Sequence, residues 1–234
     1  NHSLADFDIH APGARAAAEK LWENMRALPG LYHSEEYGGY YVAARYADVL
    51  KVLMNPHIFA SGKGITLPPP TAMRSFHIPA EIDPPAHREY RALITPFTTG
   101  EETRKYIDFM RSTVGDLLDA IPADTEIDFV RAFARPLPII ITLQILGQPT
   151  SDAALLEKMV DDLHHEVATG VRTGAADQLT DYAYRIISER KAGATDPQAD
   201  IVSSILLGQA FGRTLSAEEQ MSMIRLILIG GFDT

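Results

Sequence analysis

The chain contains no cysteine, and this absence excludes several kinds of site at once. Disulfide bonds and thiolate metal sites cannot form within it. Long apolar runs are also absent, because the longest, Pro138–Leu143 and Leu226–Ile229, are far shorter than the ~20 residues that span a bilayer. The first residues lack the charged-then-apolar pattern of a signal peptide. The sequence therefore predicts a cytoplasmic protein without a membrane-spanning helix.

Positive charge is scarce as well. Lys and Arg number 21 against 31 Asp and Glu, which gives a formal net charge of −10. A nucleic-acid-binding protein would show a basic patch, so nucleic acid is not an expected partner. No glycine-rich nucleotide loop lies between a strand and a helix, and no Ser-His-Asp nucleophile turn stands out. Apolar residues make up 46% of the 234 positions, enough for a sizeable core in one large domain or two modest ones.

Residues 1–80 read as a mixed α/β portion. Apolar side chains at helical spacing predict a helix over 14–28, and two short apolar runs predict strands over 31–34 and 39–43 joined as a hairpin. A short helix over 46–54 is stopped by Asn55-Pro56. The proline-rich residues 61–79 predict a long irregular loop, and such loops often act as lids.

Residues 81–234 form a mainly helical portion. Asp83, with Pro84 behind it, is expected to cap a helix that ends near Thr95. Further helices are predicted over 103–121, 127–147 (broken by Pro136 and Pro138), 151–167, 177–191 and 199–207, with a tight hairpin over 208–215. A last helix begins near Ala217, where Ser216 and Glu219 have capping-box spacing.

The end of the last helix is the most informative stretch. Its side chains are apolar on nearly every face, which predicts a buried helix, and Gly230-Gly231-Phe232-Asp233-Thr234 follows. Glycine permits another body to approach the backbone closely, so the stretch can be a groove where a ligand meets a carboxylate and a hydroxyl. It can equally be a helix end, because glycine after an apolar run often marks a C-cap. Spacing alone leaves both interpretations open.

Two further clusters have competing interpretations. His87 and Arg91 lie four residues apart and share a helix face, which suits an anion with two acceptors, such as a carboxylate pair. The alternative is a solvated face whose cations pair with Glu81, Asp83 or Glu89. His164 and His165 are adjacent, and adjacent helical residues do not chelate one metal well, so no metal site is predicted.

The order of these motifs resembles the cytochrome P-450 superfamily, in particular its soluble bacterial class and the camphor-hydroxylase branch. The matching segments are Arg45–Val49, Ile82–Arg91, Arg135–Pro149, Asp200–Val202 with Gly212–Leu215, and Gly230–Thr234. The resemblance implies a mainly α fold with a small β-rich N-terminal portion, truncated in the central helix. The family's E-x-x-R helix and cysteine loop do not occur, so we expect the N-terminal half of one P-450 domain that continues beyond 234.

The resemblance also implies a function. It predicts a haem-thiolate monooxygenase that hydroxylates a small hydrophobic, terpenoid-like substrate with O2, using electrons from a ferredoxin and ferredoxin reductase. The cofactor would be haem (iron protoporphyrin IX), and the chain alone, without the ligand cysteine, would not be active. By motif position, the implied roles are haem-propionate binding for His87 and Arg91, room for oxygen at Gly230 and Gly231, hydrogen bonding to dioxygen for Thr234, proton relay for Asp233, and a substrate wall at Leu226 and Ile229.

A second function class remains open on the residues alone. The same pocket in a non-enzymatic helical module would bind a hydrophobic ligand or a protein partner without chemistry. The missing cysteine favours this alternative for the literal chain.

Overall fold

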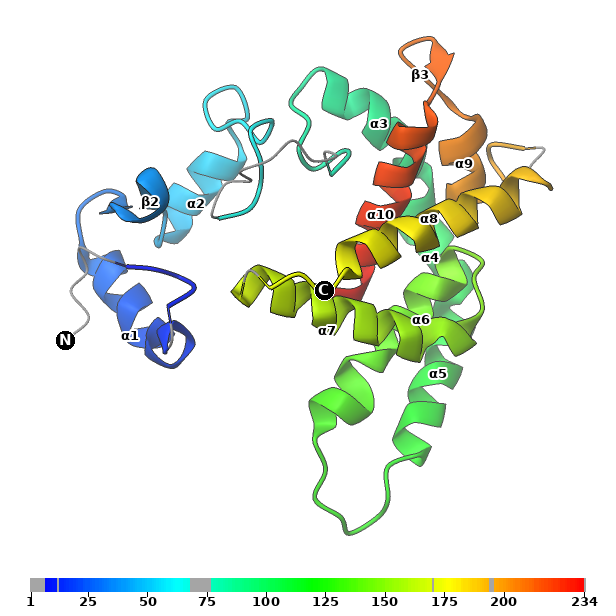
Figure 1. Cartoon of the computed structure of the whole chain (residues 1–234), viewed down its shortest axis with the longest axis horizontal. Helices are drawn as coiled ribbons and strands as arrows, with labels where there is room; N and C mark the ends of the chain where they lie inside the picture. The colour runs from blue at the N-terminus through cyan, green and yellow to red at the C-terminus, as the bar shows by residue number, and fades with distance from the viewer. Residues whose placement is uncertain (1–6, 12, 68–76, 170, 194–195, 234) are drawn as a thin grey trace. The chain divides into compact units, whose positions relative to one another are not determined.

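The computed structural model describes residues 7–11, 13–67, 77–169, 171–193 and 196–233. The described chain divides into two compact units (Figure 1). The first comprises residues 7–67 and 80–84, and the second comprises residues 77–79 and 85–233. The predicted boundary at residues 80 and 81 lies within the stretch where the chain passes from one unit to the other.

The first unit follows the predicted order of elements. It contains α1 (Ala14–Ala27), β1 (Tyr32–Ser34), the 3-10 turn η2 (Glu36–Gly38), β2 (Tyr40–Val42) and α2 (Tyr46–Leu53). The two strands pair antiparallel, with Tyr32 opposite Val42 and Ser34 opposite Tyr40. The predicted helices and hairpin are thus confirmed, with ends that differ by one or two residues.

A small aromatic core holds this unit together. Leu21 and Met25, one helical turn apart on α1, are buried with Phe7 and Tyr32. The Phe7 ring meets Trp22 edge-on at 5.5 Å between centroids. Such edge contacts add to the burial of apolar area, so α1 and the hairpin share one core.

Two acidic side chains fasten the start of the predicted loop. The Asp83 carboxylate accepts hydrogen bonds from the backbone N–H of Ser61 (2.8 Å) and Gly62 (3.1 Å), and Glu81, 1% exposed, accepts one from Ile65 N–H (3.1 Å). No helix or strand occurs in residues 61–67 or 77–79, and the middle of the loop, 68–76, lies outside the described residues.

The predicted helix cap at Asp83 is wrong. The helix α3 begins at Ala86, with Pro85 at its N-cap position. An Asp83 cap would need a backbone N–H two or three residues on, and Pro85 has none. The carboxylate serves the loop instead.

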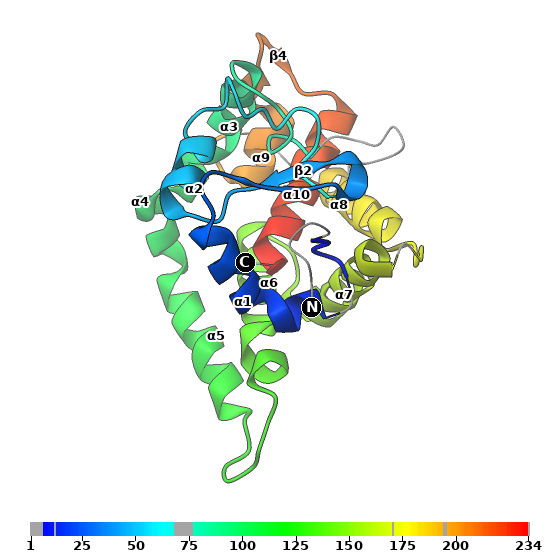
Figure 2. The same ribbon diagram turned by 90° about the vertical axis from the view of Figure 1, so that its left-hand side faces the viewer.

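The second unit is helical. It contains α3 (Ala86–Ile94), η3 (Thr95–Thr98), α4 (Gly100–Thr103), η4 (Arg104–Tyr106), α5 (Ile107–Asp119), the π-helical turn η5 (Val130–Ala134), α6 (Pro136–Ile145), η6 (Thr150–Asp152), α7 (Ala153–Thr169), α8 (Ala175–Lys191), α9 (Ile201–Leu207), β3 (Gln209–Ala210), β4 (Arg213–Thr214) and α10 (Ala217–Asp233). In both views α5 and the loop after it extend away from the other helices of this unit (Figures 1 and 2).

One predicted break is corrected. The chain is interrupted before Pro136, where the π-helical turn ends, but Pro138 lies inside α6 without breaking it. The N–H groups of the first helical turn have no intrahelical partner, so a proline at the third position removes no hydrogen bond.

The helix α10 forms the centre of this unit and packs against α6, α8 and α9 (Figure 1). Met223, Ile224 and Leu228 are almost fully buried, as the apolar sequence predicts. The predicted face of α8 is buried throughout, at Leu179, Tyr182, Ala183, Ile186 and Ile187. These two helices therefore build the main apolar core of the second unit.

Candidate functional site

One face of α10 is not covered along its C-terminal half. Leu226 and Ile229 are half-buried and Gly230 is exposed, while the other faces carry buried residues such as Leu228 and Phe232. Residues at i, i+3 and i+4 share a helix face, so these three positions form one continuous strip. Two turns of the central helix thus offer an apolar surface that ends at a residue without a side chain.

The same face is closed one turn earlier. Ser222, four residues before Leu226, is 1% exposed, and its hydroxyl accepts a hydrogen bond from the backbone N–H of Ile78 (3.0 Å). Ile78 is itself buried. The open strip therefore begins just below Ile78.

The two glycines have different surroundings. A Cβ built at Gly230 meets no described atom within 4 Å outside its own helix, whereas one at Gly231 would lie 2.7 Å from Cγ2 and 3.0 Å from Cβ of Thr142 on α6. Glycine at 231 is thus required by helix packing. Only Gly230 fits the prediction of open room beside the helix.

The remaining two motif residues are less accessible to description. Asp233 is the last residue of α10, and Thr234 lies outside the described residues. The helix-end interpretation of the glycines is wrong, since α10 continues through Gly230 and Gly231 to Asp233.

The cationic pair lies on α3. His87 is half-buried and Arg91 is exposed, and neither side chain forms a hydrogen bond or ion pair with the described residues. The acids that were candidate partners are engaged elsewhere: Glu81 and Asp83 accept from the loop amides, and Glu89 accepts from Phe211 N–H (3.3 Å). The geometry therefore gives no support to the solvated, salt-bridged face.

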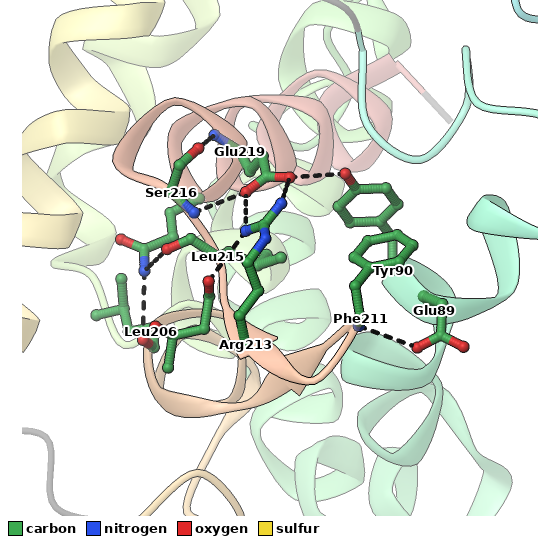
Figure 3. A network of polar contacts seen from close by, with 10 residues as sticks. Glu89, Tyr90, Leu206, Phe211, Arg213, Leu215, Ser216 and Glu219 are labelled. Atoms are coloured by element: carbon green, nitrogen blue, oxygen red, sulfur yellow. Dashed lines mark hydrogen bonds and ion pairs between the residues drawn. The ribbon is translucent and has the colours of Figure 1, made fainter.

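A polar network links α3 to the start of α10 (Figure 3). Its centre is the Glu219 carboxylate, which accepts from both terminal nitrogens of Arg213 (2.7 and 2.8 Å), from the Tyr90 hydroxyl (2.8 Å) and from Ser216 N–H (2.6 Å). Glu219 N–H donates to the Ser216 hydroxyl (3.2 Å), so the predicted capping box is confirmed. The network ties the helix that bears His87 and Arg91 to the helix that bears the open strip.

The hairpin between α9 and α10 completes this connection. Its turn holds Phe211 and Gly212 at positive φ (56° and 69°), the geometry of a two-residue hairpin turn. Phe211 adopts this conformation although it is not glycine, and its ring meets Tyr90 edge-on at 5.1 Å. The predicted hairpin over 208–215 is therefore confirmed, and it packs on α3.

The network perturbs two titrations in opposite directions. The Arg213 guanidinium, aided by the Ser216 amide and the Tyr90 hydroxyl, lowers the pKa of Glu219 from 4.5 to about 2. Burial, followed by the bond to Glu219, raises the pKa of Tyr90 to about 12. Glu219 is therefore a carboxylate, and Tyr90 a neutral donor, over the whole physiological range.

A hollow of about 300 Å³ lies behind α10, between α6, α7 and Phe232, and holds none of the other predicted site residues. Its Arg135 is already ion-paired with Asp161 and Glu157. Within the described ranges no group of three or more metal-ligating side chains occurs, and no helix has the length and apolar character to cross a membrane.

Sequence reasoning missed Thr142, Tyr90 and Ile78. Thr142 is the one polar residue in the apolar run Pro138–Leu143, which is a signal that could have been used. The partners of Tyr90 and Ile78 lie more than a hundred residues away in the chain, and no local pattern indicates them.

The comparisons with known proteins agree with this geometry. Cytochrome P450(MEG) of Priestia megaterium is 29% identical over 203 residues, which cover 81% of this chain and 49% of that protein. Erythromycin C-12 hydroxylase of Saccharopolyspora erythraea is 30% identical over 217 residues, covering 86% and 50%. The crystal structure of CYP101C1 superposes with a TM-score of 0.79 at 25% identity, covering 98% of this chain and 57% of that one. No family model matches the chain.

These neighbours define the class. They are cytochrome P450s, named monooxygenases and hydroxylases among them, and cytochrome P450s use haem as their cofactor. The chain has the cytochrome P450 fold and corresponds to the N-terminal half of such a protein, which confirms the resemblance. It spans about half the length of the curated relatives that it matches.

Proposed function

We propose that this chain is the N-terminal part of a cytoplasmic haem-thiolate monooxygenase that hydroxylates a small hydrophobic, terpenoid-like substrate with O2. Electrons would come from a ferredoxin and its reductase. The carrying observation is the open apolar strip on α10, Leu226 to Gly230, which leads directly into the Gly-Phe-Asp-Thr segment. The named activities of the relatives, such as steroid C26-monooxygenase, support the reaction type.

The described residues fit one side of a haem group. His87 and Arg91 share a face of α3 and have no acidic partner there, so they can each bind one of two carboxylates. Gly230 supplies a place where a flat macrocycle and a diatomic gas can approach the helix backbone. The axial thiolate has to come from sequence beyond this chain, because the chain has no cysteine.

The bound haem would supply the oxidation chemistry, including cleavage of the O–O bond. The protein groups would supply the rest. Leu226 and Ile229 would hold an aliphatic substrate by burial of apolar surface and exclude water from it. Asp233 would pass protons inward from solvent, and the Thr234 hydroxyl would hold the last proton next to the oxygen.

The substrate class rests on the chemistry of the strip. Its described wall consists of two aliphatic side chains and a glycine, with no charged group between Leu226 and Gly230. Ile78 closes the strip at its upper end, which favours a compact ligand over a long one. Relatives named for steroid and erythromycin substrates make substrate size a direct test.

Two measurements on the full-length protein test the proposal. The reduced, carbon monoxide-bound protein should show the red-shifted Soret band of a thiolate-ligated haem. Small terpenoids should convert the ferric spectrum from low to high spin, while long fatty acids should not. A protein that purifies without haem and still binds hydrophobic ligands would instead be the non-enzymatic binding module.

A further inference from the structure

A single hydrogen bond joins α6 to the glycine pair of α10. The Thr142 hydroxyl donates to the carbonyl oxygen of Gly231 at 3.1 Å. The same threonine occupies the space that a side chain at position 231 would need. The two residues are therefore matched in shape and in hydrogen bonding.

This contact is buried in an apolar setting. Thr142 is 7% exposed, and its neighbours Ile139 and Leu143 on α6 are almost fully buried. A buried hydroxyl requires a partner, and a helical threonine commonly finds it four residues back in its own helix. Here the bond crosses to another helix, so it fixes α10 relative to α6.

We infer that Thr142 is a positioning residue that pins the Gly230–Gly231 backbone against α6. Glycine is among the weakest helix formers, so two in succession leave this part of α10 easily distorted. Described side chains cover the Gly231 side, and the Gly230 side is open. Thr142 thus holds the backbone from behind at the point where its front is exposed.

The consequence for catalysis rests on the proposed function. If Asp233 and Thr234 deliver protons to oxygen, their placement depends on the helical backbone immediately before them. A carbonyl fixed at Gly231 sets that backbone two and three residues upstream. Loss of the bond should therefore loosen proton delivery, although Thr142 is on a different helix from the oxygen-binding motif.

The experiment uses two variants of the full-length protein that separate the hydroxyl from the methyl group. Thr142→Val keeps the shape and removes the donor, whereas Thr142→Ser keeps the donor and leaves a small cavity. Three quantities are measured: amide hydrogen exchange in a peptide covering residues 224–233, peroxide released per reductant consumed, and the thermal unfolding midpoint. Packing predicts that Thr142→Ser has the lower midpoint of the two.

The pin predicts the opposite order for function. Thr142→Val should exchange about fivefold faster in this peptide, the effect of one lost hydrogen bond, and should release severalfold more peroxide. Thr142→Ser should match the wild type in both readouts in spite of its lower midpoint. Exchange and peroxide that follow the thermal midpoint in both variants, or that stay unchanged in Thr142→Val, would overturn the inference. Faster exchange in Thr142→Val, in a protein that never reduces oxygen, would support the pin and refute the proposed function.

Discussion

Arg213 and Glu219 meet side by side, each terminal nitrogen of the guanidinium donating to one carboxylate oxygen at 2.7 and 2.8 Å. The pair joins the hairpin to the first turn of α10, and Tyr90 of α3 donates to the same carboxylate. Bidentate pairs of this kind are stronger than ordinary ion pairs. The acid side of the stability profile should therefore reflect Glu219.

Stability should fall as the pH drops from about 4.5 to about 2. The pKa of Glu219 is lowered in the folded protein from 4.5 to about 2, so its contribution is complete above pH 4.5 and is lost as the pH falls through that window. Since Arg213 is half exposed, we expect the contribution to be only about 2 kcal/mol. Urea unfolding of Glu219→Gln should show that loss at neutral pH and almost none near pH 2.

The neighbouring acid provides the control. Glu218 is exposed in the same helical turn, so Glu218→Gln changes the charge equally without touching the network. Equal effects of the two variants at neutral pH would assign the stabilisation to the helix dipole and exclude the Arg213 pair.

The two glycines should respond oppositely to alanine. Gly231→Ala brings a methyl group against Thr142 and should cost about 1–3 kcal/mol of unfolding free energy. Gly230→Ala meets no described atom and should raise stability by roughly 1 kcal/mol through helix propensity, while it blocks the open strip. Thermal unfolding of both variants, with Gly231→Ala also made in a Thr142→Ala background, separates the terms. Failure of that background to relieve the cost would rule out the clash.

Replacing the α3 cations should weaken haem retention. His87→Ala and Arg91→Ala each remove one charge-assisted bond to a propionate, and haem transfer to apomyoglobin should become roughly tenfold faster for each. Arg88→Ala is the matched control, since Arg88 is an exposed cation on the same helix but on a different face. If all three variants lost haem at one rate, the effect would be general electrostatics without a propionate site.

The motif threonine should control coupling. Thr234→Ala should leave reductant consumption within a few-fold of the wild type while peroxide replaces much of the hydroxylated product, because proton delivery falters. Thr234→Ser keeps the hydroxyl and should retain coupling. Unchanged product yield in Thr234→Ala would remove Thr234 from the mechanism.

Local sequence signals predicted the elements well. The apolar spacing of α8 and the Ser216–Glu219 cap depend on residues within one or two turns, and both are confirmed. The failure at Asp83 has a local cause, the missing N–H of Pro85, which could have been noticed. The site was harder, because the partners of Glu219 and Gly231 arrive from α3 and α6 through tertiary packing. The glycine pair was correctly singled out, but its two members could not be told apart without Thr142.

The bond from Ile78 to Ser222 has an evolutionary implication. The residue that caps the strip on α10 belongs to a connecting stretch and not to a helix, and connecting stretches tolerate substitution more readily than packed helices do. Trimming that one side chain would lengthen the accommodated molecule by a helical turn, with the reactive end left untouched. A descendant enzyme could thus acquire bulkier compounds by drift at a single linker position.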